Sequence, residues 1–188
     1  MFYASQLFKQ KMQSEVVKIL DFVEREVVQS YREQGHELTG NLVNTIRKEV
    51  EQISNGVIGV LWINEYYKYI DQGVESGRIP YSPGSGAGHS MYIEALTHYF
   101  QLRLHLDEKE ARGAAFGLAH KQLMQGMPVE NGISKYSVTG KRTGFFSQTI
   151  SENQIRIAEG VRKLYDGAMT EVINYFNHIV SGTITIKL

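Results

Sequence analysis

The stretch Leu38–Gly73 reads LTGNLVNTIRKEVEQISNGVIGVLWINEYYKYIDQG and carries most of the information about the fold. Its Asn55-Gly56 pair is a strong hairpin signal, because both residues tolerate a positive φ angle. The arm after the pair, Val57–Ile63, is rich in β-forming residues. The arm before it, Thr45–Ile53, is charged at alternate positions, as a half-exposed strand would be. We therefore predict an antiparallel hairpin, with a helix as the competing structure for the first arm.

Apolar residues at steps of three and four predict a long helix on each side of this stretch. The first helix runs from about Ser5 to Gln34, with Gly35 as its stop, and lies either on its own sheet or partly on a neighbouring subunit. The last helix is capped by Ser151 and stops at Ser181-Gly182. Its main stripe is expected at Ile157, Val161, Leu164, Ala168, Val172, Tyr175 and Ile179. The alternating residues Thr183–Leu188 predict a terminal strand, which needs a sheet edge to pair with.

The middle of the chain predicts loops and two shorter helices. A loop over Gly73–Ser90 precedes a helix over Met91–Leu106, and Asp107 is the expected N-cap of an alanine-rich helix that reaches about Gln125. The fold class is therefore α+β, with an antiparallel sheet, long N- and C-terminal helices packed on one of its faces, and a helical and loop insertion. We expect a single domain over 1–188, in which 77–144 is the insertion.

The composition argues against several classes of protein. Lys plus Arg and Asp plus Glu each number 20, whereas a chain whose main task is binding nucleic acid is usually basic. Cysteine is absent, so there is no disulfide framework and no zinc site built from thiolates. The first residues lack the charged start and apolar core of a secretory signal, and no apolar run is long enough to span a membrane. Neither a signal nor a membrane span is expected.

No motif of a catalytic or nucleotide-binding site is complete. The glycines of Gly84–Gly88 lack the Gly-Lys-Ser/Thr ending of a phosphate loop, and Gly140-Lys141-Arg142-Thr143 lacks the glycine that must precede it. Glu94, His98 and His105 are spaced to offer three ligands on one helix face, but ordinary exposed side chains are the simpler interpretation. We therefore expect no enzyme activity, no cofactor and no metal.

Tyrosine is the unusual part of the composition, with 11 residues. Tyrosine is enriched at protein interfaces, because it joins a large apolar ring to a hydrogen-bonding tip. The alternative is that these rings fill the core, which we predict for the lone Trp62. The candidate interface residues are Tyr66, Tyr67, Tyr69, Tyr81, Ile184 and Ile186. The most basic loop supplies the candidate nucleic-acid-facing residues Lys135, Lys141 and Arg142.

Several of these segments, taken in order, resemble the tail-completion and neck proteins of tailed bacteriophages. Those proteins often carry a Thr/Ser-Gly-x-Leu turn, then a hairpin, then a Tyr-rich segment that ends in an acidic residue and glycine. The matching positions here are Thr39-Gly40-Asn41-Leu42 and Tyr66–Gly73, with Asp71-Gln72-Gly73 in place of the commoner Glu-x-Gly. The alanine-rich helix that ends in Gly126-Met127-Pro128 is also similar to some of them.

The resemblance implies a structural virion protein that forms a homo-oligomeric ring in the neck or tail. Such a ring connects the portal vertex to the tail, contacts other portal, neck and tail proteins, and surrounds the channel for the genome DNA. The implied location is the virion, after assembly in the host cytoplasm, with no membrane involved. The alternative is a cytoplasmic oligomeric nucleic-acid-binding or regulatory protein that uses the basic loop.

Overall fold

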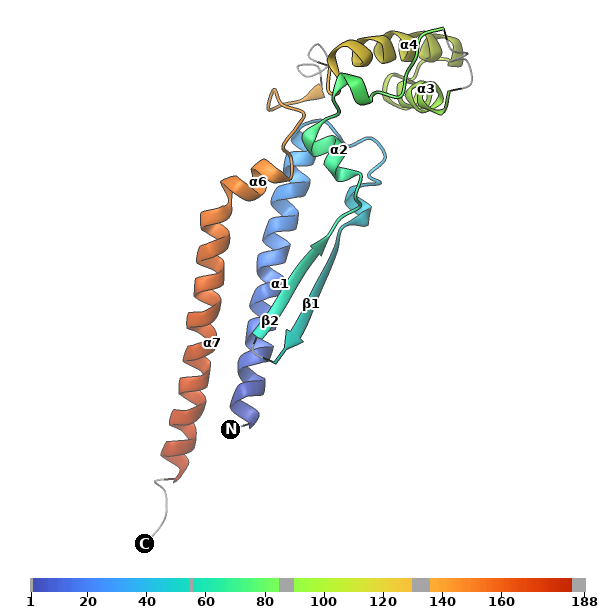
Figure 1. Cartoon of the computed structure of the whole chain (residues 1–188). Coiled ribbons are helices and arrows are strands. Elements are labelled where there is room, and N and C mark those ends of the chain that lie inside the picture. Colours follow the sequence, from blue (N-terminus) through green and yellow to red (C-terminus); the bar gives the residue numbers. More distant parts are fainter. Residues whose placement is uncertain (1, 55, 85–89, 130–135, 184–188) are drawn as a thin grey trace. The chain divides into compact units, whose positions relative to one another are not determined.

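The computed structural model describes residues 2–54, 56–84, 90–129 and 136–183 (Figure 1). The chain divides into two compact units, which we call unit 1 and unit 2. Unit 1 comprises Met1–Val28, Leu42–Asn64 and Gln148–Leu188. Unit 2 comprises Gln29–Asn41 and Glu65–Ser147.

Two long antiparallel helices form the body of unit 1 (Figure 1). Helix α1 is Phe2–Glu33, whose last turn enters unit 2, and helix α7 is Gln154–Thr183. Met12 of α1 packs against Leu164 and Ala168 of α7, which are two members of the predicted stripe of the last helix. Burial of these apolar side chains is the main force that holds the helices together.

The C-terminal part differs from the prediction in two places. Ser151 does not cap the last helix, because it lies inside the short helix α6, Ser147–Glu152, and α7 begins after a break at Asn153. Ser181-Gly182 does not stop the helix, since α7 continues to Thr183. A single glycine near a helix end weakens a helix without ending it. The rest of the predicted strand, with Ile184 and Ile186, lies outside the described residues.

A β-hairpin packs against α1 in unit 1. Strand β1 is Arg47–Ile53 and strand β2 is Gly56–Trp62, and they pair antiparallel from Arg47 opposite Trp62 to Ile53 opposite Gly56. Val57 joins the helix core, and the Nζ atom of Lys48 lies 2.5 Å from an Asp21 oxygen and 2.6 Å from a Glu24 oxygen. The predicted hairpin is confirmed, and the competing helix for its first arm is wrong. A short 3-10 helix, Val43–Thr45, precedes it.

The prediction that Trp62 belongs to the core is wrong. Its side chain is 53% exposed, and its Nε1–H donates to a Glu49 carboxylate oxygen at 2.9 Å. Neighbouring residues of a strand point to opposite faces, and the hairpin turns only the face that carries Val57 toward the helices. Trp62 and Ile58 lie on the other face, where Ile58 is also exposed.

Unit 2 is built on two helices of similar length. Helix α3, Met91–Leu104, packs on helix α4, Glu108–Gln125, through Ile93, Ala115 and Ala119. The small side chains of α4 let the two backbones approach closely. The Asp107 carboxylate accepts a hydrogen bond from the Glu110 amide at 2.8 Å, which confirms the predicted cap. Unit 2 also contains helix α2, Tyr67–Gln72, and a 3-10 helix, Ser76–Arg78.

Gly35 ends helix α1, as predicted. The Gly35 amide donates to the Arg32 carbonyl at 2.8 Å, and the His36 amide donates to the Tyr31 carbonyl at 3.2 Å. These two bonds define a Schellman motif, which needs a residue with positive φ, and Gly35 has φ +69°. The turn directs the chain after α1 so that the His36 ring lies beside the Tyr31 ring, with their centroids 5.4 Å apart.

The described residues confirm the predicted fold class, a mixture of helices and an antiparallel sheet with long helices near both ends. The prediction of a single domain with an insertion at 77–144 stays a prediction.

Candidate functional site

The predicted site residues of unit 2 do not form one patch. Tyr67 contacts Phe146, with ring centroids 5.0 Å apart, whereas Tyr81 packs on the α3–α4 core. Tyr66 is half-buried, and Tyr69 is 55% exposed and lines a cavity. Their roles as interface residues stay predictions.

The basic loop is described only in part, because Lys135 lies outside the described residues. Lys141 is exposed, whereas Arg142 is half-buried and lines the same cavity as Tyr69. The two side chains therefore differ in how far solvent reaches them.

A cavity of about 390 Å³ lies within unit 2. Its wall comes from α2, α3, α4 and the segments around His36, Met127 and Arg142. Most of the lining is aliphatic or aromatic: Tyr69, Ile70, Leu96, Tyr99, Phe100, Leu118, Met127, Pro128, Val129 and Tyr136. The polar groups are few, namely His36, Gln122 and Arg142. A concave, apolar cavity with a few polar groups is the usual form of a small-molecule site.

His36 is uncharged in the folded protein. Burial lowers the pKa of its imidazole to about 4, and the nearby charges of Arg142 and Arg103 act in the same direction. Its Nδ1 lies 3.5 Å from an Arg142 Nη2 donor and its Nε2 lies 3.4 Å from the Gln34 Oε1 acceptor.

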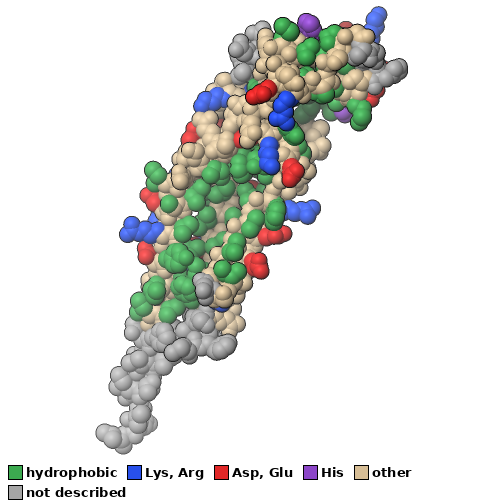
Figure 2. All heavy atoms as spheres, in the orientation of Figure 1, with side chains coloured by type: hydrophobic (Ala, Val, Ile, Leu, Met, Phe, Trp, Pro, Cys, Tyr) green, Lys and Arg blue, Asp and Glu red, His purple; other side chains and the backbone are tan. Residues whose placement is uncertain are grey.

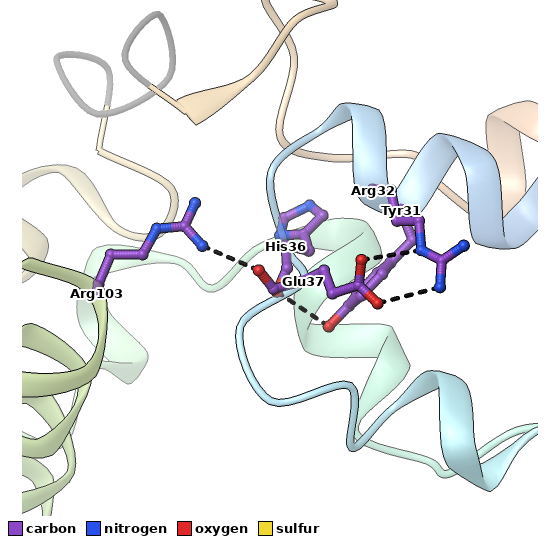
Figure 3. Close-up of polar contacts among 5 residues, drawn as sticks. All are labelled: Tyr31, Arg32, His36, Glu37 and Arg103. Atoms are coloured by element: carbon purple, nitrogen blue, oxygen red, sulfur yellow. Dashed lines mark hydrogen bonds and ion pairs between the residues drawn. The ribbon is translucent and has the colours of Figure 1, made fainter.

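The chain segment that carries His36 is held by a polar network (Figure 3). Arg103 donates to the carbonyl oxygens of Gly35 and Glu37 at 2.9 and 3.0 Å, and Arg32 binds both oxygens of the Glu37 carboxylate. The Tyr31 hydroxyl donates to the His36 carbonyl, and burial raises the pKa of that hydroxyl to about 12. These hydrogen bonds therefore hold the His36 segment of the cavity wall in place.

The acidic-x-Gly element of the resemblance has a structural explanation in unit 2. Asp71 is 4% exposed, and its Oδ1 accepts hydrogen bonds from the amides of Phe146 and Ser147 at 2.7 and 3.2 Å. A Cβ atom at Gly73 would lie 2.3 Å from the Met127 carbonyl oxygen, so only glycine fits there without a shift. Asp71 thus joins α2 to the segment at Phe146 and Ser147, and Gly73 lets the chain after α2 approach Met127 of the cavity wall.

Unit 1 carries a second candidate site, an exposed apolar stripe on α7. Val161, Tyr165, Met169 and Ile173 follow each other at steps of four residues, and Ile155 precedes them in the first turn of α7; each is 40–74% exposed. We call this set the α7 stripe. Val161 was expected on the buried face, but Leu164 and Ala168 hold that face and Val161 is exposed. On the face shown in Figure 2, hydrophobic side chains gather along the length of unit 1.

Sequence reasoning missed both the cavity and the α7 stripe. The stripe left a readable signal, because α7 has more apolar residues than one buried face needs. The cavity left none, since its wall joins residues that are far apart in the chain.

The described residues contain neither a metal-binding cluster of side chains nor a membrane-spanning helix. No group of three or more His, Asp or Glu side chains is placed to hold a metal ion. No helix in that part of the chain is long and apolar enough to cross a membrane.

The comparisons with known proteins returned no match. No protein-family model fits the chain, and no curated protein and no solved structure is similar to it.

Proposed function

We propose that this chain is a structural virion protein that forms a ring in the neck or tail of a tailed bacteriophage. The observation that carries the proposal is the α7 stripe, an exposed row of large apolar side chains on a helix whose other apolar face is already covered. Exposed apolar surface of this kind is typical of protein–protein contact sites. The resemblance of Thr39–Leu42 and Tyr66–Gly73 to neck proteins is the reason for proposing a ring in the neck or tail rather than another kind of assembly.

A ring needs two different surfaces on each copy, because its contacts run head to tail. Unit 1 offers two such surfaces, the α7 stripe and the outward face of the hairpin with Ile58 and Trp62. We propose that the stripe of one copy packs on the hairpin face of the next copy. Neither surface requires a catalytic group, in agreement with a purely structural role.

The first experiment is the mass of the purified chain by light scattering, alone and with a portal-vertex assembly. A closed ring, or a monomer that binds the portal stoichiometrically, supports the proposal. M169E places a charge in the α7 stripe and should abolish assembly. T170E is the matched control, since it adds the same charge one residue away on an exposed polar position.

Mixing two variants tests the head-to-tail arrangement directly. M169E keeps an intact hairpin face, and I58E keeps an intact α7 stripe. Each should be monomeric alone, but the mixture should form a complex of one copy of each that grows no further. Failure of the mixture to associate would contradict the proposed pairing of surfaces.

The alternative function, a small nucleic-acid-binding oligomer, makes different predictions. It requires salt-dependent DNA binding by the isolated chain and indifference to the portal. A stable dimer with that behaviour would overturn the neck proposal.

A further inference from the structure

The cavity of unit 2 has the size of a small organic ligand. Its volume is about 390 Å³, which lies in the usual range of pockets that hold small organic ligands, roughly 300–1,000 Å³. Its lining is mainly aliphatic and aromatic, which favours an apolar ligand body. The walls come from elements within unit 2 that Asp71 and Arg103 hold in place.

One charged group on the wall lacks its expected partner. Arg142 Nε is buried and has no hydrogen-bond partner among the described residues. Its Nη2 is 3.5 Å from the neutral His36, and its guanidinium carbon lies 5.8 Å from the centroid of the Tyr136 ring. No described carboxylate forms an ion pair with it. Leaving a buried guanidinium donor in this condition is costly, because its lost hydration is not replaced.

Arg103 provides the internal comparison. It also lies over the Tyr136 ring, at 4.7 Å from the centroid, but two carbonyl oxygens accept its hydrogen bonds. The guanidinium of Arg103 therefore has hydrogen-bond acceptors in the fold. The Nε of Arg142 has none among the described residues.

We infer that the cavity binds an organic monocarboxylate with an extended apolar body. The carboxylate accepts a hydrogen bond from the part of the Arg142 guanidinium that lines the cavity, and the positive charge spread over that group attracts it. The apolar body lies against Leu96, Phe100 and Leu118. A phosphate is disfavoured, since a single cation in an apolar cavity cannot replace the hydration of two negative charges. This site is independent of the proposed role of unit 1.

Decanoate is the probe, and 1-decanol is the matched probe without the charge. Titration calorimetry on the full chain should give saturable binding of one decanoate. R142Q should weaken decanoate binding roughly tenfold or more, because a hydrogen bond to a charged group is lost, and should leave decanol binding unchanged. R162Q, at an exposed position of α7, should match the wild type. L118W should weaken the binding of both decanoate and decanol, because the larger side chain fills the space for the apolar body.

Thermal unfolding without ligand separates a ligand site from an internal ion pair. Without ligand, R142M should have an unfolding midpoint at least as high as that of the wild type if the guanidinium has no partner within the protein. Decanoate should raise the midpoint of the wild type but not that of R142M. E130Q removes the acidic residue that follows Val129 in sequence. It should change neither the unfolding midpoint without ligand nor the midpoint with decanoate. Equal decanoate binding by the wild type and R142Q, or no saturable binding, would overturn the inference. So would a matching loss of stability in R142M and E130Q.

Discussion

Replacing Asp71 should lower the free energy of unfolding of unit 2 strongly for so small a side chain. Its Oδ1 accepts two backbone hydrogen bonds, from Phe146 at 2.7 Å and from Ser147 at 3.2 Å, and the side chain is almost fully buried. A hydrogen bond to a charged group contributes roughly 1.5–3 kcal/mol. Ser147 is exposed, so water can replace the longer bond in part. We therefore expect D71A to lower the free energy of unfolding of unit 2 by about 3 kcal/mol. D71N keeps an acceptor oxygen and should cost about 1 kcal/mol.

Hydrogen exchange is the suitable assay, because a chain with two compact units need not unfold in one step. A loss of about 3 kcal/mol corresponds to roughly a hundredfold faster exchange of amides that open with unit 2. Peptides from α3 and α4 should show this change, and peptides from the hairpin should not. D166A, at an exposed acid of α7, serves as the control. Exchange in α3 and α4 within a few-fold of the wild type would refute the role assigned to Asp71.

Three further predictions concern the stability of the two units. G35A should cost more than about 1 kcal/mol in urea unfolding, because φ is +69° and the new Cβ would lie 1.9 Å from a backbone oxygen. G113A, in open space on α4, should instead stabilise by about 0.5–1 kcal/mol, and equal effects would contradict this. L164A should cost about 2–4 kcal/mol, whereas V161A on the exposed stripe should cost far less in denaturation of the monomer. Since the pKa of His36 falls from 6.5 to about 4 on folding, the unfolded chain binds the proton more tightly. Stability should therefore fall as the pH drops from about 6.5 toward 4, and H36Q should flatten that pH dependence.

The elements that the sequence predicted well are those with local causes. The Asn55-Gly56 pair and the β-rich arm after it predict the hairpin from about 20 residues of sequence. The end of α1 depends on Gly35, whose positive φ few other residues adopt. Asp107 caps α4 by a bond to an amide three residues away. Each signal acts over a short distance along the chain, so a pattern can reveal it.

The features that the sequence did not reveal depend on what lies beside each element. Trp62 is in an apolar strand, but the hairpin turns one face toward the helices and Trp62 lies on the other. The cavity joins His36, Tyr69, Phe100 and Arg142, which meet only after α2, α3 and α4 have packed. No periodicity encodes that meeting. The same reasoning explains why Arg142 could be read from sequence as an exposed basic residue.

The two candidate sites can be tested against each other. Each is complete within its own unit, since the α7 stripe uses residues of unit 1 and the cavity uses residues of unit 2. If they act independently, M169E should leave the affinity for decanoate unchanged, and R142Q should leave the mass of the assembly unchanged. Coupling between two binding equilibria is reciprocal, so any effect of decanoate on assembly must equal the effect of assembly on decanoate affinity. A variant that merely misfolds is recognised separately, because it lowers the fraction of active chains in both assays and leaves the affinity of the remaining chains unchanged.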